Sequence, residues 1–372
     1  MQILLSNKYQ IIILQEANET ILLISLKKLE HNFNYLKSLV KNNTKIIAVV
    51  KAFGYGHGDI EISKKIEKLG VFALWVTDFE EGVILRKSGL KCKIIVANPG
   101  MKSYAQIIKN NLDVVIYNTR LLNLYCVNKK KVNVHIKFNT GMNRYGFEKK
   151  DLNNIILKLK NNAHLNVISV CSHLGCSDNI KKKNVTLKQL NKFNSITENF
   201  EKKIGYKTLK HILNTHGVIN FPKYQMDMVR LGIGLYDSIN NQNLQSISCL
   251  HSVVTQNRRV KKGESIGYGQ SFIAKKEMNI SIVPVGYADG LNRKLSNGIG
   301  VVKINNHICP IIGKISMDNF IVDTTNVLVC EGDIVEIFGE TITVSLIADK
   351  IKTIPYEIYS ILNRRIKRIY SD

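Results

Sequence analysis

A lysine at the end of an apolar segment is the first residue in this sequence that could do chemistry. Lys51 directly follows five apolar residues, 46–50, and four of these are β-branched, which is the pattern of a buried parallel strand. Three glycines follow within five residues, in the stretch KAFGYGHG. A lysine in this place is either an ordinary surface residue or the centre of a site, since the loops after strands often carry function.

Four more polar residues lie at or just beyond the ends of later apolar segments. They are Lys137, His173, Asn214 and Arg230. Together with Lys51 they offer several nitrogen donors and few carboxylates, so we expect no metal site. A basic cluster that is rich in hydrogen-bond donors is typical of a site for an anionic ligand such as a phosphate.

The segments that must position these residues alternate in type. Apolar residues at steps of three and four predict a helix within 26–40, and the strand at 46–50 is followed by a predicted helix at 59–69. Further strands are predicted at 71–76, 94–97, 113–117, 132–138, 166–172, 210–214 and 227–232. About eight strands alternating with helices predict an α/β fold, a closed (β/α)8 TIM-type barrel, whose chemistry sits at the carboxyl ends of the strands.

The pattern changes near residue 246. From there the sequence shows short alternating strands separated by glycine turns, which predicts a second, mainly-β domain. We therefore assign 20–245 to the barrel and 246–372 to a β-rich C-terminal domain. Residues 1–19 are either an N-terminal extension or a strand packed on the C-terminal domain.

Composition excludes several classes of protein. No apolar run reaches the roughly 18 residues of a membrane helix, and the run at 11–14 is too short for a signal peptide, so we expect a cytoplasmic protein. The net charge is +24, but the lysines are spread along the chain without interleaved aromatics, which favours compositional bias over nucleic-acid binding. Seven cysteines without a C-x-x-C pair predict neither a disulfide framework nor a zinc site.

Eight stretches, in order, resemble motifs of the alanine racemase family. AVVKAFGYGHG (48–58) resembles VVKANAYGHG, and HIKFNTGMNRYGF (135–147) resembles HLKxDTGMxRLGF. The other stretches are CSHLGCSD (171–178), HILNTHG (211–217), MVRLGIGLYD (228–237), IGYGQSF (266–272), VGYADG (285–290) and GKISMDNF (313–320). The family fold, a barrel followed by a β domain, agrees with the pattern described above.

The resemblance assigns cofactor-binding roles. Lys51 is similar to the lysine that binds pyridoxal 5'-phosphate as a Schiff base, and Arg230 to an arginine at the cofactor ring nitrogen, which donates a hydrogen bond but no proton. The residues similar to cofactor ligands are Lys51, Tyr55, His173, Asn214, Thr215, Arg230, Gly232 and Ile233. Without the motifs, His173 would be interpreted as a core histidine and Asn214 as a helix cap.

The resemblance also implies two catalytic bases, Lys51 for the D face of the substrate and Tyr268 for the L face. Without the motif, Tyr268 would be interpreted as a strand aromatic between two glycines. Arg144 and Met317 are similar to substrate-binding residues of the family. Lys137 is similar to a lysine that is found carbamylated in many members. The sequence departs from the family pattern at Phe53, Asn139, Tyr145, Ser316 and Arg364, which leaves local charge and pocket size open.

The resemblance therefore implies an enzyme, a pyridoxal phosphate-dependent alanine racemase that interconverts L- and D-alanine through an aldimine and supplies D-alanine for peptidoglycan. The alternatives are a serine or broad-specificity racemase of the same fold and, in another class, a non-catalytic pyridoxal phosphate-binding protein. A second base argues against a mere carrier. The resemblance also implies a homodimer with shared active sites, and we expect no nucleic-acid or membrane partner.

Overall fold

An eight-stranded parallel sheet forms the first part of the chain in the computed structural model, which describes residues 18–372. Its order is β8-β7-β6-β5-β4-β3-β2-β9. The strands are β2 (Lys45–Val49), β3 (Ala73–Val76), β4 (Lys93–Val96), β5 (Asp113–Ile116), β6 (Val132–Lys137), β7 (Leu165–Cys171), β8 (Leu209–His211) and β9 (Met228–Leu231). Each lies within two residues of the start predicted from the sequence, so the predicted strands are confirmed.

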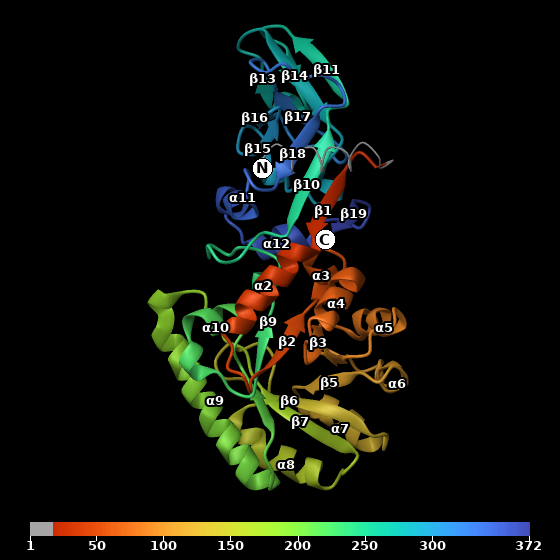
Figure 1. The fold of residues 1–372 in the computed structure, drawn as a ribbon, viewed down its shortest axis with the longest axis vertical. Coiled ribbons are helices and arrows are strands. Elements are labelled where there is room, and N and C mark those ends of the chain that lie inside the picture. The colour runs from red at the N-terminus through yellow and green to blue at the C-terminus, as the bar shows by residue number, and fades with distance from the viewer. Residues whose placement is uncertain (1–17) are drawn as a thin grey trace. The chain divides into compact units, whose positions relative to one another are not determined.

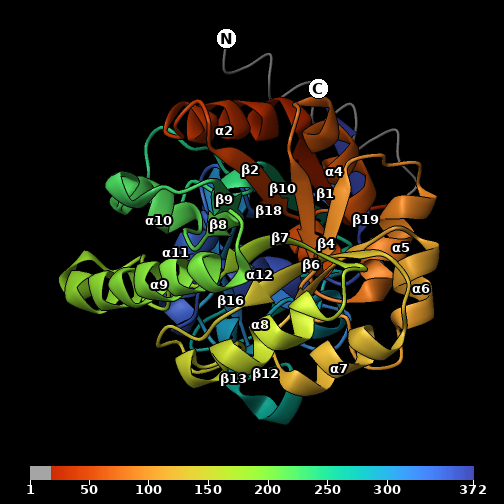
Figure 2. The same cartoon turned by 90° about the horizontal axis from the view of Figure 1, so that it is seen from below.

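The two outer strands of this sheet meet, which brings the barrel close to closure. The Arg230 amide of β9 donates to the Leu213 carbonyl, just beyond β8, at 3.0 Å. Helices surround the strands, as Figure 2 shows from below. They are α2 (Leu26–Ser38), α4 (Asp59–Lys68), α5 (Phe79–Lys87), α6 (Tyr104–Lys109), α7 (Thr119–Val127), α8 (Leu152–Lys160), α9 (Lys183–Ile204) and α10 (Thr215–Asn220). The predicted (β/α)8 barrel is thereby confirmed.

A mainly-β domain forms the rest of the chain (Figure 1). Its nine-stranded sheet has the order β11-β14-β17-β16-β15-β18-β10-β1-β19. The strands are β1 (Ile21–Ser25), β10 (Ser248–Val253), β11 (Gln256–Val260), β14 (Met278–Val283), β15 (Val301–Ile304), β16 (His307–Ile312), β17 (Phe320–Asp323), β18 (Ile334–Phe338) and β19 (Lys367–Ser371). A separate hairpin, β12 (Ser265–Ile266) with β13 (Phe272–Ile273), and helices α11 (Val344–Ile351) and α12 (Pro355–Ser360) complete it.

The domain boundaries differ from the predicted ones. The described residues form two compact units, one of residues 30–54 and 59–235 and the other of residues 18–29, 55–58 and 236–372. Strand β1 pairs antiparallel with β10 and parallel with β19, so residues 21–25 belong to the β domain and not to the predicted barrel of 20–245. Its residues are almost wholly buried because both of its edges are paired. Residues 1–17, part of the predicted extension, lie outside the described residues.

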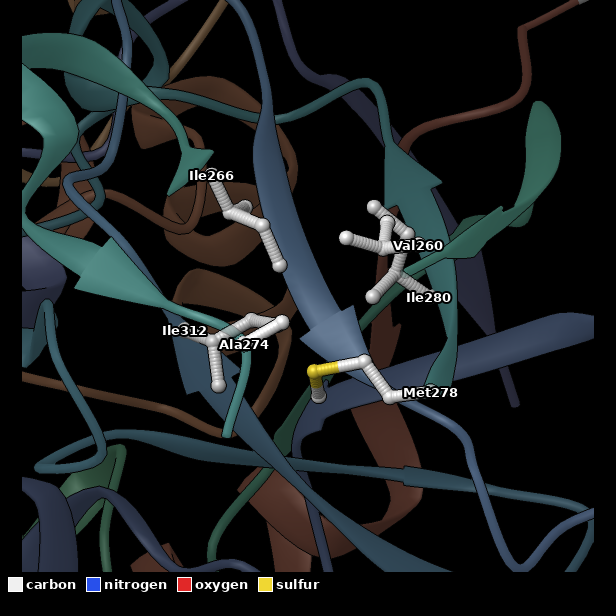
Figure 3. Packing of buried hydrophobic residues seen from close by; sticks show 6 residues of the cluster. All are labelled: Val260, Ile266, Ala274, Met278, Ile280 and Ile312. Atoms are coloured by element: carbon white, nitrogen blue, oxygen red, sulfur yellow. The ribbon is translucent and has the colours of Figure 1, made fainter. Parts of the chain in front are cut away.

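An apolar cluster in the β domain holds the hairpin that carries Tyr268. The cluster consists of Val260, Ile266, Ala274, Met278, Ile280 and Ile312, all buried (Figure 3). Ile266 and Ala274 lie on either side of the turn at 267–271 and both point into the cluster. Burial on both sides fixes the base of the turn, so the turn itself projects from an anchored hairpin.

The segment after β2 is a left-handed turn, α3 (Lys51–Tyr55). Ala52, Phe53, Gly54 and Tyr55 have φ between +53° and +59°. Side chains other than glycine rarely adopt this conformation, because the Cβ atom approaches the following carbonyl at a cost of about 1–2 kcal/mol per residue. Backbone strain of this kind persists where surrounding contacts enforce it, and it clusters at functional sites. The glycine-rich stretch therefore turns with positive φ, although three of the residues in this turn are not glycine.

Replacing Phe53 by asparagine is expected to raise the free energy of unfolding by about 1 kcal/mol, because asparagine adopts the left-handed region far more readily than phenylalanine. Denaturant unfolding of the cofactor-free protein measures the change. Phe79→Asn is the matched control, since Phe79 is also partly exposed but lies in the right-handed helix α5 and should show no gain. A loss of stability for Phe53→Asn would mean that ring packing outweighs backbone strain.

Candidate active site

Basic side chains gather at the carboxyl ends of the barrel strands. Lys51 follows β2, Lys137 ends β6, His173 follows β7 and Arg230 lies on β9. Arg144, in the loop after β6, lines a small pocket together with Lys137 and His173. Burial and, to a smaller extent, repulsion from neighbouring cations lower the pKa of Lys51, Lys137 and His173. The structure therefore brings together these residues, which the sequence predicted at strand ends.

Lys51 is largely buried, and its burial lowers the pKa of its amine below the ordinary lysine value. The nearby Arg144 guanidinium lowers this pKa further, while the carboxylate of Glu81 partly opposes both effects. A lowered pKa increases the fraction of neutral amine, which is the form that attacks a carbonyl carbon or accepts a proton. This environment is suited to covalent catalysis by Lys51.

Glu81 holds the turn that carries Lys51, although none of the sequence motifs includes it. Its Oε1 accepts the Ala52 amide at 2.6 Å and its Oε2 accepts the Thr77 amide at 2.7 Å. Burial raises the pKa of this carboxyl group, although the two amide bonds counteract the rise. The available signal is the acidic sequence DFEE (78–81), one residue beyond the predicted strand 71–76, which places carboxylates at the carboxyl end of β3.

Arg230 is 4% exposed, and its guanidinium is surrounded by acceptors. Nη2 donates to the Ser172 carbonyl at 2.6 Å, to the Ile212 carbonyl at 3.1 Å and to His173 Nδ1 at 3.1 Å. Nη1 contacts His211 Nδ1. Burial lowers the pKa of Arg230 to about 10, and no carboxylate lies within 4.0 Å of it among residues 18–372. The group is therefore a rigidly held cation without a contacting counter-ion.

His173, one of two histidines that contact Arg230, is neutral and has one defined tautomer. Burial lowers the pKa of His173 far below its usual value, and the charges of Arg230, Lys137, Arg144 and Lys51 lower it further. Because a guanidinium only donates, His173 Nδ1 must accept, and the ring carries its proton on Nε2. His173 Nε2 is therefore a hydrogen-bond donor.

The loops after β8 and β9 meet through Thr215. Its hydroxyl oxygen accepts the Gly232 amide at 2.9 Å, and Thr215 is buried. Ile233, also buried, begins a short 3-10 turn, η4 (Ile233–Leu235). Asn214 is the N-cap of α10, because its Oδ1 accepts the Gly217 amide at 2.9 Å. The helix-cap interpretation of Asn214 is thus correct, and its side-chain oxygen is already engaged.

Asn139, where the family pattern has aspartate, shapes the loop that carries Arg144. Its Oδ1 accepts the amides of Gly141 and Asn143, each at 3.0 Å, and its Nδ2 donates to Glu148 Oε1 at 2.6 Å. The bond to Glu148 needs an amide donor, which aspartate lacks. Asparagine in place of aspartate at position 139 thus suits this chain, because the carboxylate of Glu148 accepts a hydrogen bond from its side-chain amide.

Lys137 should make stability depend on pH. Burial, together with Arg230, Arg144 and Lys51, lowers the pKa of Lys137 to about 8, against an ordinary value of 10.5. Between these two values the folded protein has lost a proton that the unfolded chain keeps, so the free energy of unfolding rises with pH across this window. Lys137→Met should lose that rise and gain about 1–3 kcal/mol at pH 7 relative to wild type.

Denaturant unfolding of cofactor-free protein in CO2-free buffers from pH 7 to 10.5 checks this expectation. Lys150→Met is the control, since Lys150 is an exposed lysine outside the cluster. The same pH dependence in wild type and Lys137→Met would show that burial of this ammonium is not costly.

Tyr55 belongs to the compact unit of the β domain and not to that of the barrel. Its ring is buried and stacks on Tyr236, with centroids 4.7 Å apart. Burial raises the pKa of its phenol, so Tyr55 keeps its proton and is a donor. The next residue is fixed by the C-terminal strand, because Arg368 Nε and Nη2 donate to the Gly56 carbonyl at 3.1 and 3.0 Å. A Cβ on Gly56 would lie 1.9 Å from the Tyr359 carbonyl oxygen, so only glycine fits there.

Tyr268, the proposed second base, lies in the β domain on the turn between β12 and β13, within η5 (Tyr268–Gln270). Its side chain is 68% exposed. The glycines on both sides have positive φ, +75° at Gly267 and +65° at Gly269, as a tight turn requires. The interpretation of Tyr268 as a strand residue is therefore wrong, and its phenol is presented on an anchored turn.

Met317 lies on a loop of the β domain that neighbouring residues hold tightly. It is 53% exposed, and its carbonyl accepts the Ala288 amide at 3.0 Å. Arg365 donates to Asp289 Oδ2 at 3.0 Å and to Asp318 Oδ1 at 2.8 Å, which joins the loops at 285–290 and 316–318. The residues of the motifs VGYADG and SMD therefore hold the loop on which the exposed Met317 lies.

The donor set of the barrel fits pyridoxal phosphate. Ammonium, guanidinium, hydroxyl and amide donors suit a phosphate and a substrate carboxylate, and the amine of Lys51 suits an aldehyde. Among residues 18–372 no group of His, Cys, Asp and Glu could hold a metal ion. No helix in that range is long and apolar enough to cross a membrane. Fold and donor set thus define a barrel enzyme that binds a phosphorylated carbonyl cofactor at the carboxyl ends of its strands.

Comparison with known proteins identifies the family. The alanine racemase N-terminal domain matches residues 24–238, and the alanine racemase C-terminal domain matches residues 247–370. Alanine racemase 1 of Caldanaerobacter subterraneus is 34% identical over 364 residues, covering 93% of each chain. An amino-acid racemase of Enterococcus faecalis is 32% identical over 95% of this chain and 52% of its own length.

Solved structures agree with this result. Alanine racemase of Clostridium difficile has a TM-score of 0.89 and 29% identity, covering 96% of this chain and 97% of the other. Alanine racemase of Bartonella henselae with covalently bound pyridoxal phosphate has a TM-score of 0.86 and 27% identity, covering 95% of this chain and 100% of the other. The chain belongs to the alanine racemase family, whose members are pyridoxal phosphate-dependent isomerases.

Proposed function

We propose that this protein interconverts L- and D-alanine in the cytoplasm as a homodimer with shared active sites, and that the D-alanine enters peptidoglycan. Lys51 and Tyr268 are the two catalytic bases in this proposal. The observation that carries it is the environment of Lys51, whose pKa is lowered by burial and by Arg144 at the carboxyl end of β2. An exposed lysine at a strand end would lack both influences.

The residues that would hold the cofactor come from the strand ends and from the KAFGYGHG stretch. Lys51 would bind it covalently, and Tyr55, Thr215, Gly232 and Ile233 would hold its phosphate. His173, Asn214 and Arg230 would complete the site. When bound, pyridoxal phosphate supplies an aldehyde that links to an amine and a ring that withdraws electrons from the substrate α carbon.

Arg230 would limit how strongly the ring of the bound cofactor withdraws electrons. A guanidinium donates a hydrogen bond and retains its proton, even with a pKa lowered to about 10. Fixed by its acceptors, Arg230 would keep the ring nitrogen unprotonated. Prompt return of a proton to the α carbon is then favoured over side reactions, which is what racemisation requires.

Proton transfer needs a base on each face of the α carbon. Lys51, with its lowered pKa, would remove or return the proton on one face. Tyr268 would act on the other face, and a hydrogen bond from His173 Nε2 would stabilise its phenolate. Removal of a proton by one base and its replacement by the other inverts the configuration.

Arg144 and Lys137 would serve the substrate carboxylate. Arg144 supplies the positive charge, while Lys137, with a pKa of about 8, has enough neutral amine near pH 8 to add CO2. That addition forms an N–C bond and releases one proton, and the resulting carbamate would be an anionic partner for Arg144. Met317 would contact the substrate from the β domain.

A racemisation assay with purified protein, pyridoxal phosphate and a panel of L-amino acids tests the proposal. Loss of optical rotation with L-alanine well ahead of L-serine supports it, and no rotation change with any amino acid would leave only a cofactor carrier. The broad-specificity alternative is favoured by one observation, the exposed Tyr145 ring over Lys137 at 5.8 Å, where the family pattern has leucine. Comparable rates with several amino acids would establish that alternative.

A further inference from the structure

A row of buried polar side chains crosses the barrel and ends at Arg230. It consists of Asp113 at the start of β5, His135 on β6, Ser169 on β7 and His211 at the end of β8, and we refer to these four residues as the relay. All are at most 4% exposed. His135 Nδ1 lies 2.6 Å from Ser169 Oγ, Ser169 Oγ lies 3.2 Å from His211 Nε2, and His211 Nδ1 contacts Arg230 Nη1.

The Arg230 end of the relay fixes the direction of its hydrogen bonds. A guanidinium only donates, so His211 Nδ1 accepts. Burial, together with the Arg230 charge, lowers the pKa of His211 far below its usual value, so the ring is neutral and carries its proton on Nε2. Nε2 then donates to Ser169 Oγ, and the Ser169 hydroxyl proton is left to donate to His135 Nδ1.

The Asp113 end requires the same direction. Asp113 Oδ2 lies 3.6 Å from His135 Nε2, and neither atom has a hydrogen-bond partner among residues 18–372. A carboxylate facing a ring nitrogen favours a proton on that nitrogen and disfavours a lone pair. The other carboxylate oxygen, Oδ1, accepts from Asn133 Nδ2 at 2.9 Å. Both ends of the relay therefore place the proton of each histidine on Nε2.

The relay joins two buried charges that lack contacting partners of opposite sign. In the described part of the chain, Arg230 has no carboxylate and Asp113 has no lysine or arginine within ion-pair distance, and the ring that faces Asp113 is that of His135. The Asp113 carboxylate polarises the His135 ring across 3.6 Å, and the hydrogen bonds from His135 through Ser169 to His211 pass this polarisation on, so His211 Nδ1 becomes a better acceptor. Asp113 thereby acts on Arg230 without touching it.

We propose that Asp113, His135 and Ser169 are positioning residues for Arg230, which they hold through His211 by fixing its tautomer and strengthening its acceptor nitrogen. The effect on catalysis rests on the proposed role of Arg230 at the cofactor ring. The tautomers themselves do not depend on that role, so they can be tested separately.

Nitrogen NMR of the holoenzyme labelled at histidine tests the tautomers. The chain has nine histidines, and single His→Gln replacements assign His135 and His211. Both should be neutral with the proton on Nε2. In Asp113→Leu, both rings should keep the proton on Nε2, because Arg230 still requires His211 Nδ1 to accept, while the nitrogen shifts of His135 should move because the facing carboxylate is gone. Protonation on Nδ1 in wild type, or His135 shifts that do not respond to Asp113→Leu, overturns the proposal.

Kinetics of the same holoenzymes test the positioning role. Asp113→Leu and Ser169→Ala should each lower kcat roughly tenfold with little change in KM, since a weaker acceptor loosens Arg230. The double variant should be no slower than the slower single variant, because both break one connection. Ser63→Ala is the matched control, since Ser63 is a buried serine on α4 outside the relay.

The outcomes separate the relay from the proposed function. Additive losses, or unchanged kcat in both variants with active wild type, overturn the positioning role. A wild type that racemises nothing contradicts the proposed function, and the NMR result then decides on the relay by itself.

Discussion

Lys51→Ala is expected to lower alanine racemisation about 10³-fold or more, because it removes both the cofactor amine and one of the two bases. The only other lysine with a lowered pKa in the same cluster of the described barrel is Lys137, at the end of a different strand. A lysine on β6 cannot take over the position after β2 without a different cofactor orientation. The rate of L-alanine racemisation at saturating pyridoxal phosphate measures the loss.

Two variants control this experiment. Lys51→Arg keeps the positive charge but has no neutral amine, so it should be as inactive as Lys51→Ala. Lys150→Met, at an exposed site, should retain wild-type activity. Activity of Lys51→Ala within tenfold of wild type would show that another group carries the cofactor.

Mixing Lys51→Ala chains with Tyr268→Phe chains is expected to restore activity that neither variant has alone. Tyr268 is 68% exposed on an anchored turn of the β domain, as expected for a side chain that completes the active site of a partner chain. In a two-fold dimer one site of a mixed pair carries both lesions and the other carries neither. With random pairing half of the dimers are mixed, so roughly one quarter of wild-type sites return.

The refolded mixture must be shown to contain heterodimers, for example with two affinity tags. The matched control pairs Lys51→Ala with Lys51→Arg, a mixture in which every site lacks the amine and no activity should return. Heterodimers without recovered activity would place both bases on the same chain.

Much of the barrel could be predicted from the sequence, because each short apolar run fills the interior of one strand and each strand end then positions one polar residue. Lys51, Lys137, His173 and Arg230 follow directly from this rule. Strand β1 could not be placed, because its apolar residues fit either sheet and only pairing with β10 and β19 decides. The interpretation of Tyr268 as a strand residue fails for a related reason, since glycines beside an aromatic residue occur both in strands and in turns.

The contacts that tune the site were not predictable from the motifs. Glu81 is 30 residues beyond Lys51 in sequence, and only the adjacent ends of β2 and β3 bring its oxygens to the Ala52 amide. The relay depends on His135 and Ser169 facing the barrel interior at matching heights, which is set by the register of β6 on β7. Alternation alone does not give that register, because it shifts between Val134 and His135.

Lys51 is expected to carry pyridoxal phosphate as a Schiff base, and borohydride reduction of the holoenzyme followed by peptide mapping can identify the modified lysine. Reduction should fix one cofactor per chain on the peptide that contains Lys51. A label on Lys137 or any other lysine, or the absence of a label on protein that binds the cofactor, would exclude Lys51 as the cofactor lysine.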